Sequence, residues 1–475
     1  MAKKTIAIDP VTRIEGHLKA EVVVENGKVV DAKLFGGMYR GFETILKGRD
    51  PRDSTQIVQR ICGVCPTSHA MASACAQEDA FKIKITDNAR ITRNLILGAN
   101  YLQSHILHFY HLAALDYVKG PETAPFIPRM DKPDLRLPDD VNKVGVEQYL
   151  EALEVRRIAH QMVAIFGGRM PHVHGIAPGG ATQIPTKETL TEYAARFNVV
   201  EKFVKEKYLP VTYLVGSLYK DLFAQGHGHM NASCFGVFKL DGDDKNFLLK
   251  PGVFINGKDV PFDPKKVTES VKHSFFDNKT TGKNFTEGQT VVDPEKKGAY
   301  SFIKAPRYDG APVESGPAAR MWITNPPVSE VGKKMLKEHF GLEVKNFRDL
   351  GQKTVFSIMG RHVARAEETL LIAEQVSKWL KEIKPEKETW TEWEIPVTAE
   401  GFACTEAPRG SLIHYLKVKD SVIDNYQIVS GTIWNCCPRD DKGVRGPIEE
   451  SLLGVEVPDI DNPVNVGRLI RSYDP

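Results

Sequence analysis

The stretch Arg60-Ile-Cys-Gly-Val-Cys-Pro-Thr-Ser-His69 is the sharpest chemical feature of this 475-residue chain. Two cysteines separated by two residues can direct both sulfur atoms at one metal ion, and Gly63 and Pro66 suit a tight turn around them. Thiolates are soft ligands that suit zinc, nickel, copper or iron–sulfur centres. The stretch is therefore predicted to supply half of a thiolate metal site.

A single Cys-x-x-Cys pair has other uses as well. It occurs in redox dithiols and in zinc half-sites, and it can be two buried free thiols. A thioredoxin-type site has a strand before the pair and a helix opening at it, which this sequence does not clearly offer. Structural zinc needs two further ligands at similar spacing, whereas Cys436 and Cys437 are adjacent. These three alternatives stay open. The other cysteines are expected to be ordinary buried thiols: Cys75, Cys234, Cys404, Cys436 and Cys437.

The overall composition is that of a globular protein. Hydrophobic residues make up 41% and charged residues 26%, and 63 Lys plus Arg against 61 Asp plus Glu give a net charge of +2. This balance gives no sign of nucleic-acid binding. The N-terminus lacks the apolar core of a signal peptide. The most apolar stretch, residues 94–115, carries too many polar side chains for a lipid-facing helix, so we expect a buried helix.

Sequence patterns predict an α+β fold, with a central bundle of long α-helices and peripheral β-rich segments. Asn26-Gly27 between β-prone runs predicts a hairpin within Lys19–Leu34. Long helices are expected at residues 87–118, capped by Asp87, at 146–166, at 187–208, stopped by Pro210, and at 355–383. Prolines in residues 120–140 predict an irregular crossing. Residues 241–310 are expected to form a smaller β-rich lobe, and the chain from Trp390 to form short strands and turns.

Further motifs accompany the cysteine pair, in order along the whole chain. The blocks are Asp9-Pro-Val-Thr-Arg-Ile-Glu-Gly-His17, Gly36-Gly-Met-Tyr-Arg-Gly-Phe-Glu43, Glu406-Ala-Pro-Arg-Gly410, Trp434-Asn-Cys-Cys-Pro-Arg-Asp440 and Arg445-Gly-Pro-Ile-Glu449. Together they resemble the large subunits of nickel–iron hydrogenases, most closely the nickel–iron–selenium branch, and this resemblance implies one family domain over residues 1–475.

The resemblance implies a nickel–iron centre, with CO and cyanide on iron, that oxidises dihydrogen reversibly and heterolytically to protons and electrons. Cys62 would be a terminal nickel ligand and Cys65 a bridge between nickel and iron. Pro408, Arg409 and Thr432 would line the pocket for CO and cyanide, because they fall where the family places these residues.

Other roles follow from the same resemblance. Glu15 would transfer protons from a dry site, and His69 would support the bridging Cys65. Many relatives carry Asp at the position of Ser104, so here Arg409 and Asp474 would supply the electrostatic field at the metals. Arg409 is also one candidate to take the proton from dihydrogen. Glu43 would bind a separate magnesium or iron ion, for which carboxylate oxygen is suited.

The family completes its centre with two thiolates from a C-terminal Asp-Pro-Cys-x-x-Cys. This sequence ends Asp474-Pro475, so the second half of the metal motif is missing after residue 475. We expect selenocysteine directly after Pro475, read conventionally as a stop; a shortened sequence is the alternative. The 475-residue form is predicted to be catalytically inactive, because two thiolates cannot replace four.

The resemblance also implies partners and location. Too few cysteines are grouped here for an iron–sulfur relay, so a small subunit with iron–sulfur clusters is expected, followed by a cytochrome or similar electron acceptor. Export with the small subunit would place the enzyme in the periplasm, with the cytoplasm as the alternative. The rival is a non-catalytic, quinone-reducing relative; such proteins lack the metal cysteines. His105, His108 and His111 are expected in the core or at the small subunit, and His227 and His229 in a loop facing it.

Overall fold

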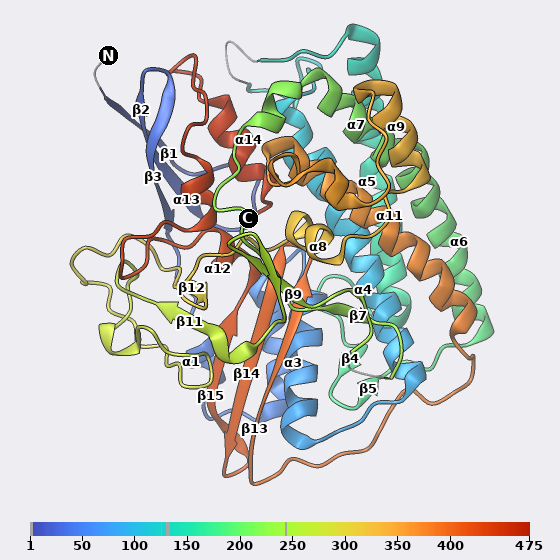
Figure 1. Cartoon of the computed structure of the whole chain (residues 1–475). Coiled ribbons are helices and arrows are strands. Elements are labelled where there is room, and N and C mark those ends of the chain that lie inside the picture. Colours follow the sequence, from blue (N-terminus) through green and yellow to red (C-terminus); the bar gives the residue numbers. More distant parts are fainter. Residues whose placement is uncertain (1–2, 125, 130–133, 243–244) are drawn as a thin grey trace.

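Long helices lie side by side on one side of the molecule, and most strands lie on the other (Figure 1). The computed structural model describes residues 3–124, 126–129, 134–242 and 245–475. The predicted α+β class is confirmed. The longest helices are α4 (Asp87–Leu107), α5 (Asp139–Gly167), α6 (Lys187–Phe203) and α11 (Ile358–Glu382).

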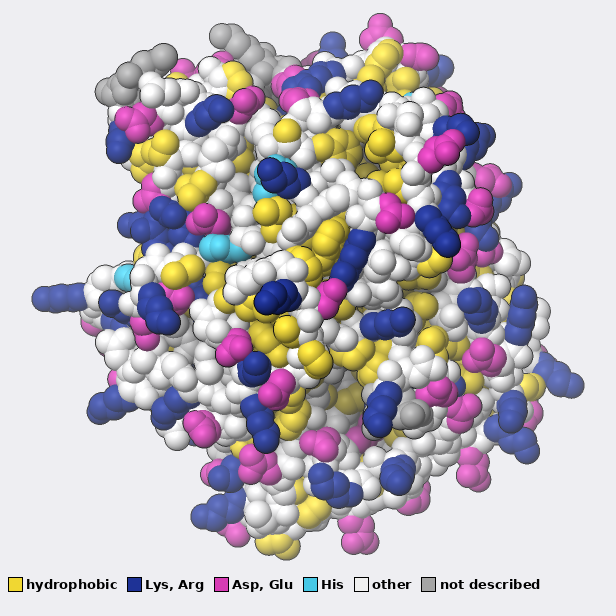
Figure 2. Space-filling model, viewed as in Figure 1, with side chains coloured by type: hydrophobic (Ala, Val, Ile, Leu, Met, Phe, Trp, Pro, Cys, Tyr) yellow, Lys and Arg dark blue, Asp and Glu magenta, His cyan; other side chains and the backbone are white. Residues whose placement is uncertain are grey.

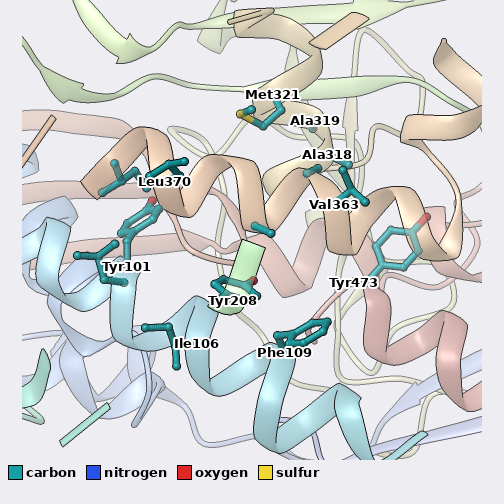
Figure 3. Packing of buried hydrophobic residues seen from close by; sticks show 14 of the residues in the cluster. Tyr101, Ile106, Phe109, Tyr208, Ala318, Ala319, Met321, Val363, Leu370 and Tyr473 are labelled. Atoms are coloured by element: carbon teal, nitrogen blue, oxygen red, sulfur yellow. The ribbon is translucent and has the colours of Figure 1, made fainter. Parts of the chain in front are cut away.

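Helix α4 is the centre of the bundle and is buried on nearly all sides. Figure 3 shows Tyr101 and Ile106 on this helix, and Phe109 in the turn after it, on the side of Val363 and Leu370 of α11. The expected buried helix is thus confirmed, and no helix in the described part of the chain has the length and apolar character needed to cross a membrane. Thr86, not Asp87, caps the helix, because its hydroxyl accepts the Ala89 N–H.

Several helix boundaries differ from the prediction. Helix α4 ends at Leu107, and the chain continues as a π-helical turn, His108–Ala113, instead of as α-helix to residue 118. Helix α5 begins at Asp139, directly after the last proline of the crossing, and its Gly145 packs closely on Val118. Pro210 does not end the third helix. A π-helical turn at Val204–Tyr208 joins α6 to α7 (Leu209–Leu218), so Pro210 falls in the first turn of α7, where a missing N–H costs little. Residues 125 and 130–133 of the expected crossing lie outside the described residues.

The N-terminal sheet contains the predicted hairpin. Strands β1 (Lys4–Ile8), β2 (Leu18–Glu25) and β3 (Lys28–Gly36) pair in that order, all antiparallel. Alternate residues of β2 are buried, so one face of the sheet packs on the core.

A second sheet supports the metal-binding region. Strands β13 (Thr398–Ala407), β14 (Gly410–Lys419) and β15 (Val422–Val429) form an antiparallel meander that packs against α3 (Pro66–Phe81). The prediction of short strands here was wrong. Strand β14 is covered on both faces, with Leu412 and Leu416 in one hydrophobic cluster and Ile413 and Tyr415 in another. Burial on both faces removes the alternation that marks a long strand in sequence.

Residues 241–310 contain short strands and no α-helix among the residues described: β8 (Phe247–Leu249), β9 (Gly252–Ile255), β10 (Lys258–Val260), β11 (Val267–Ser270) and β12 (Ala305–Tyr308). Strand β9 also pairs with β6 (Ala232–Cys234), which ties this segment to the rest of the chain. On the face shown in Figure 2, side chains of both charge signs are interspersed, as the net charge of +2 suggests.

Candidate metal centre

Cys62 and Cys65 lie at the start of helix α3. Cys65 is the residue before the helix, Pro66 occupies its first turn, and the Cys65 N–H donates to the Cys62 sulfur at 3.2 Å. Both side chains are buried. A helix therefore does open at the pair, contrary to our sequence interpretation, but a 3-10 turn rather than a strand precedes it.

The loop between the cysteines is anchored to helix α4. The side-chain amides of Asn100 and Gln103 both donate to the Val64 carbonyl, at 3.1 and 2.8 Å. These two bonds fix the turn from the side of the bundle, so both sulfur atoms are held before any metal binds.

The two thiols differ in acidity. The Cys65 thiol donates to Cys62, and this bond, helped by the charge of Arg409, keeps the pKa of Cys62 below its usual value despite burial. The same bond, together with burial, raises the pKa of Cys65. Cys62 is therefore the first of the pair to ionise, and a thiolate is the form that binds metal.

Arg409 and Asp474 lie beside the thiols. Nη2 of Arg409 is 3.0 Å from Oδ1 of Asp474, and both side chains are buried. Burial works against the charge of Arg409, but Asp474, Cys62 and Cys65 outweigh it and raise the pKa of the guanidinium. Arg409 is therefore a permanent positive charge at this place. Its Nη1 reaches Ser104 at 3.5 Å.

Two glycines let the backbone of Arg409 approach helix α12 (Gly431–Asn435). A Cβ on Gly431 would lie 2.6 Å from the Gly410 nitrogen, and one on Gly410 would lie 2.1 Å from the Ser315 hydroxyl. This contact brings Thr432 next to the Arg409 segment, while the Pro408 carbonyl accepts a bond from Arg320 at 2.8 Å. Pro408, Arg409 and Thr432 thus share one region.

Glu15 reaches the same turn from the N-terminal segment. Its Oε1 accepts the Gly63 N–H at 3.2 Å, and its own N–H donates to the Pro475 carbonyl at 3.0 Å. The side chain is exposed, not in the dry site that we expected. Gly63 is exposed as well, so no element in the described part of the chain covers the edge formed by Glu15 and Gly63.

The C-terminal segment ends beside the cysteine pair. The carboxylate of Asp116 binds Arg471 at 2.6 and 2.8 Å and also binds Arg13. His108 bonds the Arg471 carbonyl at 2.6 Å. Figure 3 shows Tyr473 packed beside α11. This ion-pair cluster could not be predicted from the sequence, because its members come from three distant segments.

His69 lies on α3, one turn after Cys65. Its Nδ1 is 3.1 Å from Nε2 of His414 on β14, and Nδ1 of His414 is 2.7 Å from the Tyr426 hydroxyl on β15. Neither His414 nor Tyr426 was singled out from the sequence.

Glu43 stands in a separate polar cluster. Its carboxylate accepts the Ile428 N–H at 2.8 Å and the Thr290 hydroxyl, and the Lys304 ammonium is 3.9 Å away. Lys304 also lies 3.4 Å from the buried Glu269. Protein groups therefore contact both carboxylate oxygens of Glu43.

Three other histidines singled out from the sequence bond groups of the chain. His105 contacts Glu368 at 2.9 Å, His111 the Tyr149 carbonyl at 3.2 Å and His229 the Arg445 carbonyl at 3.0 Å. Of the other cysteines, Cys234, Cys436 and Cys437 are buried as expected, whereas Cys75 and Cys404 are only partly buried.

These residues fit half of a thiolate metal centre. Among the residues described, no group of three or more His, Cys, Asp or Glu side chains is arranged to hold a metal ion. Near the two thiols, Nε of Arg409 and both carboxylate oxygens of Asp474 are buried with no hydrogen-bond partner of proper geometry in the described part of the chain. Such groups are costly to bury, and an anionic ligand set beside Arg409 would satisfy its guanidinium.

Comparison with known proteins identifies one family. The family described as nickel-dependent hydrogenase matches residues 40–122 and 118–475, and residues 5–35 match one described as HoxL-like.

Individual relatives agree along the whole chain. The periplasmic [NiFeSe] hydrogenase large subunit of Desulfomicrobium baculatum is 64% identical, with 100% of this chain and 94% of that protein covered. The hydrogenase-2 large chain of Escherichia coli K12 is 34% identical, with 99% and 95% covered. The Ni-Fe-Se hydrogenase of Desulfovibrio vulgaris Hildenborough, solved in its as-isolated oxidised state, superposes with a TM-score of 0.99 at 65% identity, with 100% and 98% covered.

Proposed function

This chain belongs to the nickel-dependent hydrogenase family, and we propose that it is the large, metal-bearing subunit of a nickel–iron–selenium hydrogenase. The reaction is the reversible heterolytic oxidation of dihydrogen to protons and electrons. The observation that carries the proposal is the buried Cys62–Cys65 pair beside Arg409 and Asp474, in a chain 64% identical to a [NiFeSe] large subunit.

Cys62 and Cys65 would hold the nickel–iron centre, Cys62 as a terminal and Cys65 as a bridging ligand. When bound, such a centre supplies the Lewis acidity that lets dihydrogen split without a strong free base. Pro408, Arg409 and Thr432 would surround the CO and cyanide ligands. The guanidinium of Arg409 can donate to an anionic ligand, and because its pKa is raised it serves as a fixed charge rather than as a base.

Glu15 would carry protons between the centre and the surface. Its carboxylate already bonds the Gly63 N–H within the metal-binding turn, and its other side is exposed. A group in this position can accept a proton inside and release it outside. His69 and Asp474 would support the site from its buried side.

The polar cluster at Glu43 is the proposed place of a magnesium or iron ion. A hard cation there would take oxygen from Glu43. The ammonium of Lys304 lies 3.9 Å from the same carboxylate, so binding requires Lys304 to move or to remain outside the coordination shell.

As a large subunit, the chain has a small-subunit partner. We propose that this partner carries iron–sulfur clusters, covers the exposed edge at Glu15 and Gly63 and passes electrons to a cytochrome or similar acceptor. Covering the edge would also give Glu15 the dry surroundings expected from the sequence. A periplasmic location is proposed from the named location of the Desulfomicrobium relative.

The test is elemental analysis and intact mass of the enzyme purified with its small subunit from the native host. We expect nickel, iron and selenium together, and dihydrogen uptake. Cys62→Ser should lose nickel, whereas Cys436→Ser, a buried thiol elsewhere, should keep it. Zinc alone, or no metal with no uptake, would replace this proposal by a zinc or redox-dithiol protein or by a non-catalytic relative.

A further inference from the structure

A line of buried hydrogen-bonding groups runs from the metal-binding helix into the supporting sheet. His69 on α3 contacts His414 on β14 at 3.1 Å, and His414 contacts Tyr426 on β15 at 2.7 Å. His69, His414 and Tyr426 are at most 2% exposed. Water is therefore excluded, and each group depends on its neighbour in the line for its hydrogen bond.

Both imidazoles are neutral. Burial, helped by the charge of Arg40, lowers the pKa of His69 to about 3, and burial next to His69 lowers the pKa of His414 as well. A neutral imidazole has one N–H donor and one acceptor nitrogen. Fixing one nitrogen as donor or acceptor therefore fixes the other nitrogen of the same ring. The tautomer of His414 in this way determines the tautomer of His69.

The direction of the line is set at Tyr426. Its hydroxyl lies 2.7 Å from Nδ1 of His414, the shorter of the two contacts in the line, so this bond decides which of the two atoms carries the hydrogen.

The phenol hydrogen is directed to Nδ1 of His414, because a phenol is a stronger donor than a neutral imidazole N–H. An imidazole nitrogen is also a stronger acceptor than a phenol oxygen. With Nδ1 of His414 accepting, its Nε2 carries the hydrogen and donates to Nδ1 of His69.

We propose that Tyr426 and His414 are positioning residues that hold His69 in the tautomer with its hydrogen on Nε2. Cys65 and His69 are four residues apart at the start of one helix, on the same face. The N–H of His69 would then be available to Cys65, the proposed bridging ligand. A partner that fixes the ring nitrogens in this way tunes the ligand it serves. The effect on Cys65 as a metal ligand rests on the proposed function, whereas the tautomer of His69 does not.

The tautomers can be read without metal, by nitrogen NMR of the full chain labelled with ¹⁵N-histidine, because protonated and bare ring nitrogens have well-separated shifts. In the wild type we expect a bare Nδ1 and a protonated Nε2 for both His69 and His414. The opposite assignment at either residue overturns the proposal.

Variants test whether Tyr426 fixes the tautomers of His414 and His69. Tyr426→Phe keeps the ring but removes the hydroxyl, and should give averaged shifts at His414 and His69. Tyr193→Phe is the matched control: it removes another buried hydroxyl, bonded to the Leu95 carbonyl at 2.8 Å, and should leave those signals unchanged. If Tyr426→Phe also leaves them unchanged, the proposal fails.

Replacement of His414 adds a rescue test. His414→Gln retains an amide N–H that can donate to Nδ1 of His69 and should preserve its tautomer, whereas His414→Leu should not. Equal His69 spectra in the two variants overturn the proposal. In the metal-loaded heterodimer, Tyr426→Phe should slow dihydrogen uptake by about 10-fold, with nickel retained. If His69 has a single tautomer in a protein that takes up neither nickel nor dihydrogen, the proposed function is refuted, but the present inference is not.

Discussion

Arg409 and Asp474 connect two distant parts of the chain directly beside the cysteine pair, with Nη2 of one 3.0 Å from Oδ1 of the other. Asp474 adopts a positive φ of 59°, a conformation that Asp tolerates better than most residues. Cys62 and Cys65 act on the same guanidinium, since both raise its pKa. The buried positive charge of Arg409 is therefore close to one carboxylate and to two thiols that can ionise.

Arg409→Lys should lower dihydrogen uptake by about 10- to 100-fold, the usual loss for a residue that supports a metal ligand. Lysine keeps the charge but loses the planar set of donors. Uptake per bound nickel measures the effect. The matched control is Arg52→Lys at the exposed pair with Asp50, which should behave as wild type. Full uptake by Arg409→Lys would show that charge alone is sufficient.

Glu15→Gln should reduce dihydrogen–deuterium exchange by about 100-fold or more, because the amide can still accept the Gly63 N–H but cannot carry a proton. Nickel and iron content should not change. Glu25→Gln changes a carboxylate at the end of β2 and should leave the rate unaltered. An unchanged rate in Glu15→Gln would assign proton transfer to another group.

Gly431→Ala should displace the Arg409 segment. The new Cβ would lie 2.6 Å from the Gly410 nitrogen and 2.7 Å from the Arg409 carbonyl carbon, both backbone atoms that cannot rotate away. We expect a loss of about 1–3 kcal/mol in the free energy of unfolding, measured with urea, and weaker nickel retention. Gly37→Ala, where nothing lies within 4 Å, should be neutral. Wild-type stability in Gly431→Ala would mean that the two segments can separate without cost.

Local patterns accounted for most of the helices, the N-terminal hairpin and the cysteine turn. The hairpin depends on Asn26-Gly27, and the metal half-site on Cys62 and Cys65, which are three positions apart. In both cases the residues that act together are close in the sequence. Arg409 was found only because its motif resembles the family's.

Contacts between distant residues could not be predicted. His69 and His414 are 345 positions apart, and Asp116 and Arg471 are 355 apart. A single His on a strand carries no sign of its partner. The exposure of Glu15 was missed for a different reason, because the sequence of one subunit does not contain the surface that would cover it.

Asp116→Asn should loosen the C-terminal segment. Burial alone would raise the pKa of Asp116, but Arg471 and Arg13 outweigh it and hold the pKa below its usual value. The stabilisation is therefore present above the ordinary Asp pKa and is lost as the pH falls through the lower, folded-state value. Removing the charge should cost about 3–5 kcal/mol in urea unfolding at neutral pH. Asp461→Asn, at an exposed pair with Lys4, should cost about 1 kcal/mol or less. An equal loss in the two variants would show that Asp116 does not hold the C-terminal segment in place.

Acid should destabilise the chain through its buried histidines. Glu449, whose pKa burial raises to about 7, acts in the opposite direction but is one group against several. Burial is the main cause that lowers the pKa of His105, His108, His362 and His414, and it lowers that of His69 to about 3. Below the ordinary His pKa the unfolded chain binds protons that the folded chain does not. The stability is complete above about pH 6.5 and falls as the pH decreases towards the folded-state pKa values.

Each such histidine should contribute a slope of about 1.4 kcal/mol per pH unit to the free energy of unfolding. Urea unfolding between about pH 7 and pH 5 measures the sum. His362→Gln removes one titrating group and should reduce the slope by about that amount, whereas His174→Gln, at an exposed position, should not change it. A free energy of unfolding that stays constant over this range would mean that the buried imidazoles take up protons in the folded state, and His69 would then be charged beside Cys65.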